Sequence, residues 1–417
     1  MCSTIKTFII NASDWYNKGD VGNRIGMILA LKKAFGDNVN IVLESSTAEI
    51  DSKYFAKYGV KVIQGPLHIQ SSRHLSISLV VHMFLKYLYL ALLAFTARVF
   101  KIPKVKDPYL NEMLCADLIL SSAGGFIHDE LKLVSLQNII PIAVASLILN
   151  KPVILYAQSI GPFSRRFTIL LTKVVLSRIE LIILRERKSI EYIEKMGLKV
   201  PVLVTTDASF TLLSLLNGVQ KNVSRPIRKV GVTVVGKFES RNFERDYVKY
   251  VTTLASVIRY IIEKYQAKVY ILPQTLIEYD VATAYLLKNL VTRANQMEIE
   301  IVKMDCTPEK LISMYAKMDF MICSRLHSAI FASLSGTPII VLSYQHKAEG
   351  ILEQLGLKEL VVDIRKISLD KLIPLVDYVA EHKESLHNLM EKRILVLYKK
   401  SLVSAFIVKH YLNKLKQ

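Results

Sequence analysis

The feature that most constrains this chain is the regular alternation of short apolar runs with longer stretches of helical spacing. The short runs are typical of strands buried on both faces of a sheet, and the intervening stretches of amphipathic helices. This order predicts a mostly parallel sheet with helices on both faces. The expected strands of the first half are Lys6–Asn11, Val39–Leu43, Val60–Ile63, Asp117–Ser121, Pro152–Tyr156, Leu181–Leu184 and Val200–Thr205.

A polar, basic stretch, Asn217–Lys229, interrupts this alternation and is typical of an interdomain linker. A chain of 417 residues is long for one core. We therefore expect an N-terminal α/β domain over residues 1–217, a linker over 218–229, a C-terminal α/β domain over 230–368 and helices over 369–417. Two successive doubly wound, Rossmann-like domains form a GT-B-like architecture. The expected strands of the second half are Val230–Val235, Lys268–Leu272, Ile299–Val302, Asp319–Cys323 and Pro338–Ser343.

Basic residues outnumber acidic ones by 55 to 36, which gives a formal charge of +19. Nucleic acid, an anionic membrane or small acidic substrates would each suit such an excess, and so would scattered solvated lysines. The sequence has no zinc spacing, no RNP-like aromatic run and no basic arm, so we expect no nucleic-acid partner. The four cysteines form no Cys-x-x-Cys pair, and no signal-peptide pattern opens the sequence. We expect a cytoplasmic protein without disulfides.

The segment Leu75–Phe100 is about long enough to cross a bilayer, but Lys86 near its centre disfavours a spanning helix. Lys101, Lys104 and Lys106 follow at once. An aromatic-rich apolar helix beside cations favours peripheral contact with the membrane through residues 75–106, on the inner face. A buried helix, a partner-binding helix and a spanning helix remain alternatives.

Ligands of open parallel sheets bind beyond the carboxyl ends of the strands, so polar residues just after each strand are candidates for a site. Asn17, Gly19 and Asp20 precede a helix whose N–H groups could bind an anion or a sugar hydroxyl, although Asp20 could equally cap that helix. Gly124 and Gly125 could let the backbone approach a ligand near Asp129, or could simply form a turn.

Three further candidates follow strands of the first half. Gln158 and Ser159 lie at a strand end, before the turn at Gly161 and Pro162. Arg185 also follows a strand directly and could hold an anion, or could pair with Glu186 or another nearby carboxylate.

The most informative segment follows the strand Asp319–Cys323. Ser324 could cap the next helix, and Arg325 and His327 lie in its first turn, where the helix dipole is already positive. A bound anion would compensate this charge, since arginine suits phosphate or carboxylate and histidine can donate a proton. Ser343, Tyr344 and Lys347 follow the next strand. A solvated arginine and a packed histidine remain the alternative.

An ordered set of short motifs resembles the polysaccharide pyruvyltransferase family. The motifs are Asn17-x-Gly19-Asp20, Gly124-Gly125, AQSIGPF at 157–163, ILRERKS at 183–189, Asp207-Ala-Ser-Phe210, Ser324-Arg-Leu-His-Ser328, Gly336-Thr-Pro338 and Ser343-Tyr-Gln-His-Lys347. They run in family order from about residue 11 to 360. The sequence departs from the family at Gly124-Gly125-Phe126, where a third glycine is common.

The resemblance implies a GT-B-like transferase that uses phosphoenolpyruvate to form a pyruvate ketal on a polysaccharide or a lipid-linked glycan, without cofactor or metal. It implies a catalytic set of His327 as acid with Arg325 and Arg185 as anion clamps. The C-terminal domain would hold the donor and the N-terminal domain the acceptor. The implied substrate-binding residues are Asn17, Gly19, Asp20, Gly124, Gly125, Asp129, Gln158, Ser159, Ser324, Ser343, Tyr344 and Lys347. A nucleotide-sugar glycosyltransferase of the same fold and a non-catalytic membrane scaffold are the alternatives.

Overall fold

The computed structural model describes residues 4–12, 14–66, 77–129, 136–216, 226–276, 279–292, 299–302, 305–344 and 346–415, without the side chains of residues 77, 79, 80, 136, 346, 347 and 415. The chain divides into two compact units. The first contains Met1–Trp15, Asp20–Thr211 and Lys399–Gln417, and the second contains Tyr16–Gly19 and Leu212–Tyr398. Most of the expected linker, residues 217–225, lies outside the described residues.

The first unit is built on a parallel sheet whose main strands run in the order β3-β2-β1-β4-β6-β7-β8. The chain order reverses between β1 and β4, so the sheet has its topological switch point there. The short strand β5 pairs with β6 off this path. The strands are β1 (Ile5–Ile10), β2 (Val39–Ser45), β3 (Lys61–Gln64), β4 (Leu118–Ser121), β5 (Gly124–Ile127), β6 (Val153–Ile160), β7 (Leu181–Leu184) and β8 (Val202–Val204).

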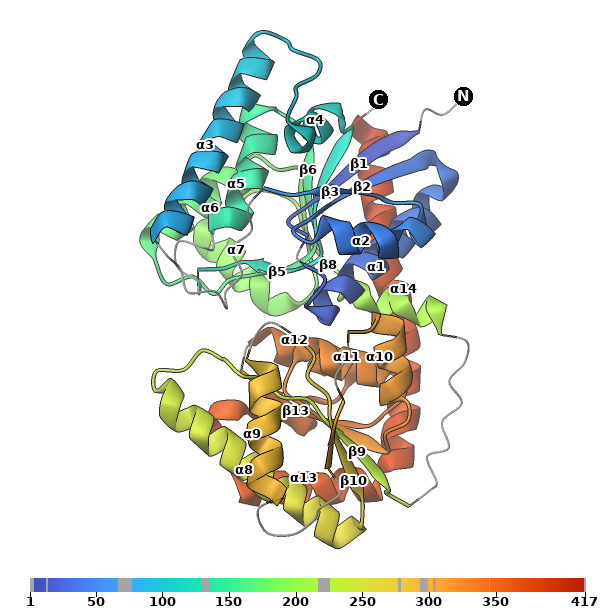
Figure 1. Cartoon of the computed structure of the whole chain (residues 1–417). Helices are drawn as coiled ribbons and strands as arrows, with labels where there is room; N and C mark the ends of the chain where they lie inside the picture. Colours follow the sequence, from blue (N-terminus) through green and yellow to red (C-terminus); the bar gives the residue numbers. More distant parts are fainter. Residues whose placement is uncertain are drawn as a thin grey trace. The chain divides into compact units, whose positions relative to one another are not determined.

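Helices cover both faces of this sheet, because alternate side chains of its strands are buried on opposite sides. Phe8 and Ile10 join the core shared with α3, α5, α6 and α7, and Ile9 is fully buried as well. In Figure 1 these four helices lie on one side of the sheet, and α1 and the end of α14 lie on the other. The helices are α1 (Lys18–Phe35), α2 (Ala48–Phe55), α3 (Ile77–Val99), α4 (Pro108–Cys115), α5 (Leu136–Ala143) with the π-turn η4 (Val144–Ile148), α6 (Arg166–Leu176) and α7 (Ile190–Met196).

The second unit repeats this plan with the parallel order β11-β10-β9-β12-β13-β14, and its switch point lies between β9 and β12. Its strands are β9 (Lys229–Val232), β10 (Lys268–Ile271), β11 (Ile299–Ile301), β12 (Phe320–Cys323), β13 (Ile339–Ser343) and β14 (Val361–Asp363). Its helices are α8 (Phe243–Tyr265), α9 (Asp280–Thr292), α10 (Pro308–Tyr315), α11 (Leu326–Leu334), α12 (His346–Leu355) and α13 (Leu369–Glu381), and α14 (Lys383–Leu415) follows.

The predicted fold class, two doubly wound α/β sheets with C-terminal helices, is confirmed. The sequence analysis did not predict β14 or β5. Gly124 and Gly125 were expected in a loop, but they begin β5, where Gly124 pairs with Gln158 of β6. Gly124 has a φ of 152°, which glycine adopts readily, and this lets the strand start directly after β4.

The apolar segment near residue 75 forms α3, which packs one stripe of side chains into the first unit and leaves the opposite stripe exposed. Met83, Tyr87, Leu90 and Ala94 belong to the packed stripe. Within the described ranges, no helix combines the length and hydropathy that crossing a bilayer requires.

Candidate functional site

The loops after β9 and β12 meet at the switch point of the second sheet. The backbone N–H of Ser324 donates to Thr233 Oγ1 at 3.0 Å, and Thr233 Oγ1 lies 2.8 Å from Ser328 Oγ. Ser328 Oγ in turn donates to the carbonyl oxygen of Arg325. These buried hydroxyls fix the path of the chain from β12 into α11.

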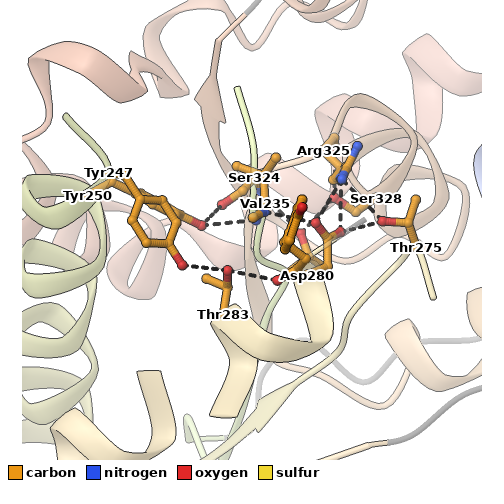
Figure 2. Close-up of polar contacts among 12 residues, drawn as sticks. Val235, Tyr247, Tyr250, Thr275, Asp280, Thr283, Ser324, Arg325 and Ser328 are labelled. Atoms are coloured by element: carbon orange, nitrogen blue, oxygen red, sulfur yellow. Dashed lines mark hydrogen bonds and ion pairs between the residues drawn. The ribbon is translucent and has the colours of Figure 1, made fainter. Parts of the chain in front are cut away.

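Arg325, the N-cap residue of α11, forms a bidentate ion pair with Asp280 in the first turn of α9 (Figure 2). Its Nε donates to Asp280 Oδ2 at 3.0 Å and its Nη2 to Asp280 Oδ1 at 2.7 Å. Nη2 also donates to Thr275 Oγ1 at 3.1 Å. Asp280 Oδ1 accepts the N–H of Gly236 as well, at 2.9 Å. Asp280 is fully buried, whereas the Arg325 side chain is 12 % exposed.

This pair changes the electrostatic argument drawn from the sequence. A bound anion was expected to compensate the arginine at the start of α11, but the carboxylate of Asp280 supplies that compensation from within the protein. Arg325 is therefore held in one orientation before any ligand binds. Because Asp280 occupies the Nε–Nη2 edge of the guanidinium, a ligand carboxylate or phosphate would have to approach its remaining edge.

Tyr250 of α8 forms hydrogen bonds with the same two loops. Its hydroxyl lies 2.9 Å from Ser324 Oγ and accepts the N–H of Val235 at 3.2 Å (Figure 2). Burial raises the pKa of this phenol, so it stays protonated. Ser324 thus bonds to Tyr250, and α11 begins without a side-chain cap, contrary to the capping role considered for Ser324.

His327 lies against Gly19. Both residues belong to the second unit, which includes the short segment Tyr16–Gly19. A β-carbon at position 19 would stand 2.3 Å from His327 Nδ1, so only glycine allows this approach. Asn17 forms an isolated antiparallel bridge with Thr275, and its Oδ1 accepts the N–H of Gly19 at 3.1 Å. The second unit thus brings together Asn17, Gly19, Arg325 and His327. The sequence analysis selected all four, but it expected Asn17 and Gly19 in the N-terminal domain with the acceptor, apart from Arg325 and His327.

Lys18 is a buried cation in the same segment that the sequence analysis did not select. Its Nζ lies 3.1 Å from Oδ1 of Asp305, whose side chain is largely exposed. The sequence signal for Lys18 was its place inside the motif Asn17-x-Gly19-Asp20, whose other residues were selected.

A small hollow of about 20 Å³ opens between the ends of β12 and β13, and its walls include Ser324, Ser343 and Tyr344. This is far below the range of roughly 300–1,000 Å³ usual for ligand pockets, so the hollow marks an open edge of the sheet and is not a formed pocket. Tyr344 packs against Phe238, with ring centroids 6.3 Å apart. Lys347 belongs to α12, but its side chain lies outside the described residues.

The switch point of the first sheet holds a second, separate polar cluster. Asn11 Nδ2 donates to Ser121 Oγ at 3.0 Å, and Gln158 Nε2 donates to the same oxygen at 2.7 Å. Gln158 Nε2 also donates to the carbonyl of Ser122 at 2.7 Å. Among the described residues, the buried Gln158 Oε1 and Ser122 Oγ have no hydrogen-bond partner.

Arg185 forms an ion pair with Asp207, so the alternative of pairing with a nearby carboxylate is confirmed. Its Nη1 lies 2.7 Å from Asp207 Oδ2, and its Nε donates to Ser159 Oγ at 2.8 Å. The side chain of Arg185 is only 2 % exposed. The predicted residues Ser159 and Arg185 are therefore in contact. Asp207, the first residue of the motif Asp207-Ala-Ser-Phe210, completes their cluster.

The two candidate aspartates differ in environment. Asp129 is buried, and its carboxylate accepts the N–H groups of Ser164 and Arg165 at 2.7 to 2.9 Å. Asp129 thus fixes the turn that leads into α6. Asp20 lies in the first turn of α1 and is half-buried. Gly125 is half-buried in β5.

Sequence reasoning missed the polar partners of the predicted residues: Thr233, Tyr250, Thr275, Asp280, Asn11 and Ser121. Asp280 could have been found from its place in the first turn of α9, where a carboxylate is favoured. Within the described ranges, no group of three or more histidine, cysteine, aspartate or glutamate side chains lies together as a metal site.

Two successive parallel α/β units, each with a polar cluster at its switch point, define a protein of the GT-B-like fold. Solved structures with this fold include UDP-GlcNAc 2-epimerase from Neisseria meningitidis bound to UDP-GlcNAc, at a TM-score of 0.61 and 12 % identity over 98 % of this chain and 100 % of that one. Anabaena Alr3699/HepE in complex with UDP and glucose has a TM-score of 0.58 and 13 % identity over 98 % and 100 %. At such identities the likeness concerns the fold alone.

The polysaccharide pyruvyl transferase family model matches residues 17–346, so the chain belongs to this family and is an enzyme of it. The amylovoran biosynthesis protein AmsJ of Erwinia amylovora is 23 % identical over 307 residues, which is 70 % of this chain and 72 % of AmsJ. The resemblance inferred from the ordered motifs is thereby confirmed.

Proposed function

We propose that this enzyme transfers the pyruvyl group of phosphoenolpyruvate to two hydroxyls of one sugar in a polysaccharide or lipid-linked glycan, forming a pyruvate ketal and releasing phosphate. Family membership and the similarity to a protein of amylovoran biosynthesis support this reaction class. The observation that carries the donor assignment is the preset pair of Arg325 and Asp280 beside His327, at the start of α11.

The donor binds at the switch point of the second sheet. Its carboxylate or phosphate lies at the N-terminus of α11, where the helix dipole and the guanidinium of Arg325 favour an anion. Ser324, Ser343 and Tyr344 line the adjoining hollow and contact the rest of the small donor. Lys347 contributes further positive charge.

His327 is the acid of the reaction. It protonates the methylene carbon of phosphoenolpyruvate, which becomes the methyl group, and positive character develops on the adjacent carbon. One sugar hydroxyl adds to that carbon and loses its proton, which restores the imidazolium. The C–O bond to phosphate then breaks, the second hydroxyl closes the ring, and its proton leaves with the phosphate. Cationic groups at α11 stabilise the departing anion.

The acceptor sugar binds at the switch point of the first sheet. Gln158 and Ser122 are candidates for contact with it, because Gln158 Oε1 and Ser122 Oγ have no protein partner among the described residues. The half-buried Gly125 allows close approach, whereas the Phe126 ring fills the space beside Gly124. Asp20 is the candidate to take the proton of the first hydroxyl and pass it to the imidazole. Arg185 acts here as a positioning residue for Ser159 instead of a direct anion clamp, because its side chain is only 2 % exposed, against 12 % for Arg325.

Thermal stabilisation tests the donor assignment, since a ligand that binds only the folded state raises Tm once its concentration exceeds Kd. We expect phosphoenolpyruvate to raise Tm of the wild-type protein, and Arg325→Ala to lose this shift. Arg365→Ala, which removes an exposed arginine of the same unit, should keep it. A shift with nucleotide sugars alone would instead identify a glycosyltransferase, and near-normal turnover in His327→Gln would exclude His327 as the acid.

A cytoplasmic location stays a prediction. It agrees with phosphoenolpyruvate as a donor.

A further inference from the structure

Helix α3 is apolar over most of its circumference, but only one stripe of it is packed. Its outward stripe includes Phe84, Leu88, Leu92 and Phe95, and Phe84 is 61 % exposed. A soluble monomer rarely leaves so many large apolar side chains together on one helix, and such patches usually mark an interaction surface.

Helix α6 adds a second apolar stripe in the same helical layer. Phe167, Leu170 and Val174 recur at helical spacing and are exposed, Leu170 by 61 %, while Thr168, Thr172 and Val175 face inward. Both helices contribute side chains to the same core. Helix α6 packs against α5, and α3 packs against η4, which continues α5. We call the outward stripes of α3 and α6 together the apolar face (α3 and α6 are labelled in Figure 1).

The two segments that carry the apolar face have charges of a single sign. No acidic residue occurs between Ile77 and Lys106 or between Phe163 and Ile179. The basic residues of these two segments are Lys86, Arg98, Lys101, Lys104, Lys106, Arg165, Arg166, Lys173 and Arg178. Most of them are exposed at the helix ends or beside the apolar stripe. Apolar side chains rimmed by cations match the acyl and headgroup layers of an anionic membrane.

We propose that the apolar face is a peripheral membrane-binding surface that inserts Phe84, Leu92, Phe95 and Leu170 into the interfacial layer of an anionic bilayer. The cations bind lipid phosphates at the same time. Peripheral insertion also agrees with the absence of a helix able to cross a bilayer among the described residues. The proposal extends the contact expected from residues 75–106 to α6, which the sequence alone did not implicate.

A second copy of the chain fits this surface less well than lipid does. In a two-fold symmetric dimer the same patch faces itself, so the two cationic rims would be brought together without acidic partners. A bilayer containing anionic lipid supplies both the apolar layer and the opposite charge.

Vesicle flotation of the full-length protein tests the proposal without any substrate. We expect binding to vesicles of phosphatidylglycerol and phosphatidylcholine, weaker binding to phosphatidylcholine alone, and loss of binding as salt increases. The triple variant Phe84→Ser, Leu92→Ser, Phe95→Ser should reduce the bound fraction at least about tenfold. Phe167→Ser with Leu170→Ser should also reduce it, because α6 belongs to the same surface.

The matched control is Val248→Ser with Val396→Ser, which removes exposed apolar side chains from the second unit and should leave flotation unchanged. Circular dichroism and Tm show whether each variant is folded. Absence of vesicle binding in the wild type, or unchanged binding in both sets of variants, would overturn the proposal. So would concentration-dependent dimerisation that the α3 variant abolishes while vesicles fail to bind, since the occupant would then be a second copy. Phosphoenolpyruvate binding is measured separately, so failure here leaves the donor assignment intact.

Discussion

The imidazole of His327 lies directly against the Cα of Gly19, so that a β-carbon at position 19 would stand 2.3 Å from Nδ1. Two motifs more than three hundred residues apart in sequence thus constrain one another within the second unit. The glycine is required by this contact and not by its backbone, because its φ is not in the left-handed region. A contact that fixes the orientation of the proposed acid makes position 19 part of the catalytic arrangement.

Gly19→Ala is expected to displace His327 and to lower kcat at least about tenfold, since a displacement of about 1 Å can cost up to a hundredfold in rate. The measurement is steady-state turnover with phosphoenolpyruvate. Stability gives an independent test. In the His327→Gly background no side-chain atom of residue 327 remains to clash, so Gly19→Ala should stabilise the protein by about 0.5–1 kcal/mol through its helix preference. Equal effects of Gly19→Ala in both backgrounds would show that the two residues are not coupled.

Arg325→Ala should destabilise the second unit by about 3–5 kcal/mol, because it leaves the buried carboxylate of Asp280 without its counter-charge. Urea unfolding measures this loss. The exposed pair of Arg365 and Asp363 provides the comparison, since its Nε–Oδ1 distance is also short at 2.9 Å. Arg365→Ala should cost less than about 1 kcal/mol. Similar losses in the two variants would contradict the buried, preset state of Arg325.

Tyr250→Phe should destabilise the protein by about 1–3 kcal/mol and raise KM for phosphoenolpyruvate, because the N–H of Val235 loses its acceptor and Ser324 its partner. The natural control is Tyr315, a fully buried tyrosine whose hydroxyl has no hydrogen-bond partner among the described residues. Tyr315→Phe should be neutral or stabilising. A loss for Tyr250→Phe no larger than that for Tyr315→Phe would remove the positioning role of Tyr250.

Glu44 should make the first unit less stable as pH rises. Burial raises the pKa of this carboxyl to about 7, and the N–H of Asn11 and the hydroxyl of Tyr109 offset only part of that effect. In the unfolded chain a glutamate titrates near pH 4.3. The folded state therefore binds the extra proton between about pH 4.3 and 7, and stability is lost across this window as pH increases.

Glu44→Gln keeps the group uncharged at every pH, so it should gain stability over the wild type at pH 8, by up to roughly 3 kcal/mol. At pH 4 the gain should vanish. Urea unfolding at several pH values gives the difference between the two proteins, which cancels the titration of all other groups. A difference that does not change with pH would mean that Glu44 is ionised normally in the folded state.

The fold was largely predictable from the sequence, since buried parallel strands form continuous apolar runs. Leu181–Leu184 was predicted with its observed bounds. The strand β5 was not predictable, because its two glycines have low strand preference and only pairing with β6 stabilises them. Strands were predicted correctly where a continuous apolar run marks them in the sequence itself.

The candidate site was predictable as a set of strand ends but not as a set of contacts. Arg325 and His327 were selected because charge at a helix N-terminus is unfavourable without a partner. That the partner is Asp280, 45 residues earlier, depends on the order of strands in the sheet. Arg185 shows the same limit, because pattern alone left its carboxylate open and the structure supplies Asp207.

The long helix α14 begins in the second unit and ends in the first, to which Lys399–Gln417 belong. Ser404 Oγ donates to Thr205 Oγ1 at 2.8 Å, across 199 residues of sequence. During synthesis the chain therefore finishes the first α/β unit last, because its closing helical segment leaves the ribosome only after the whole second unit has been made. An N-terminal fragment ending near residue 211 would lack this segment and would expose the face of the first sheet that it covers.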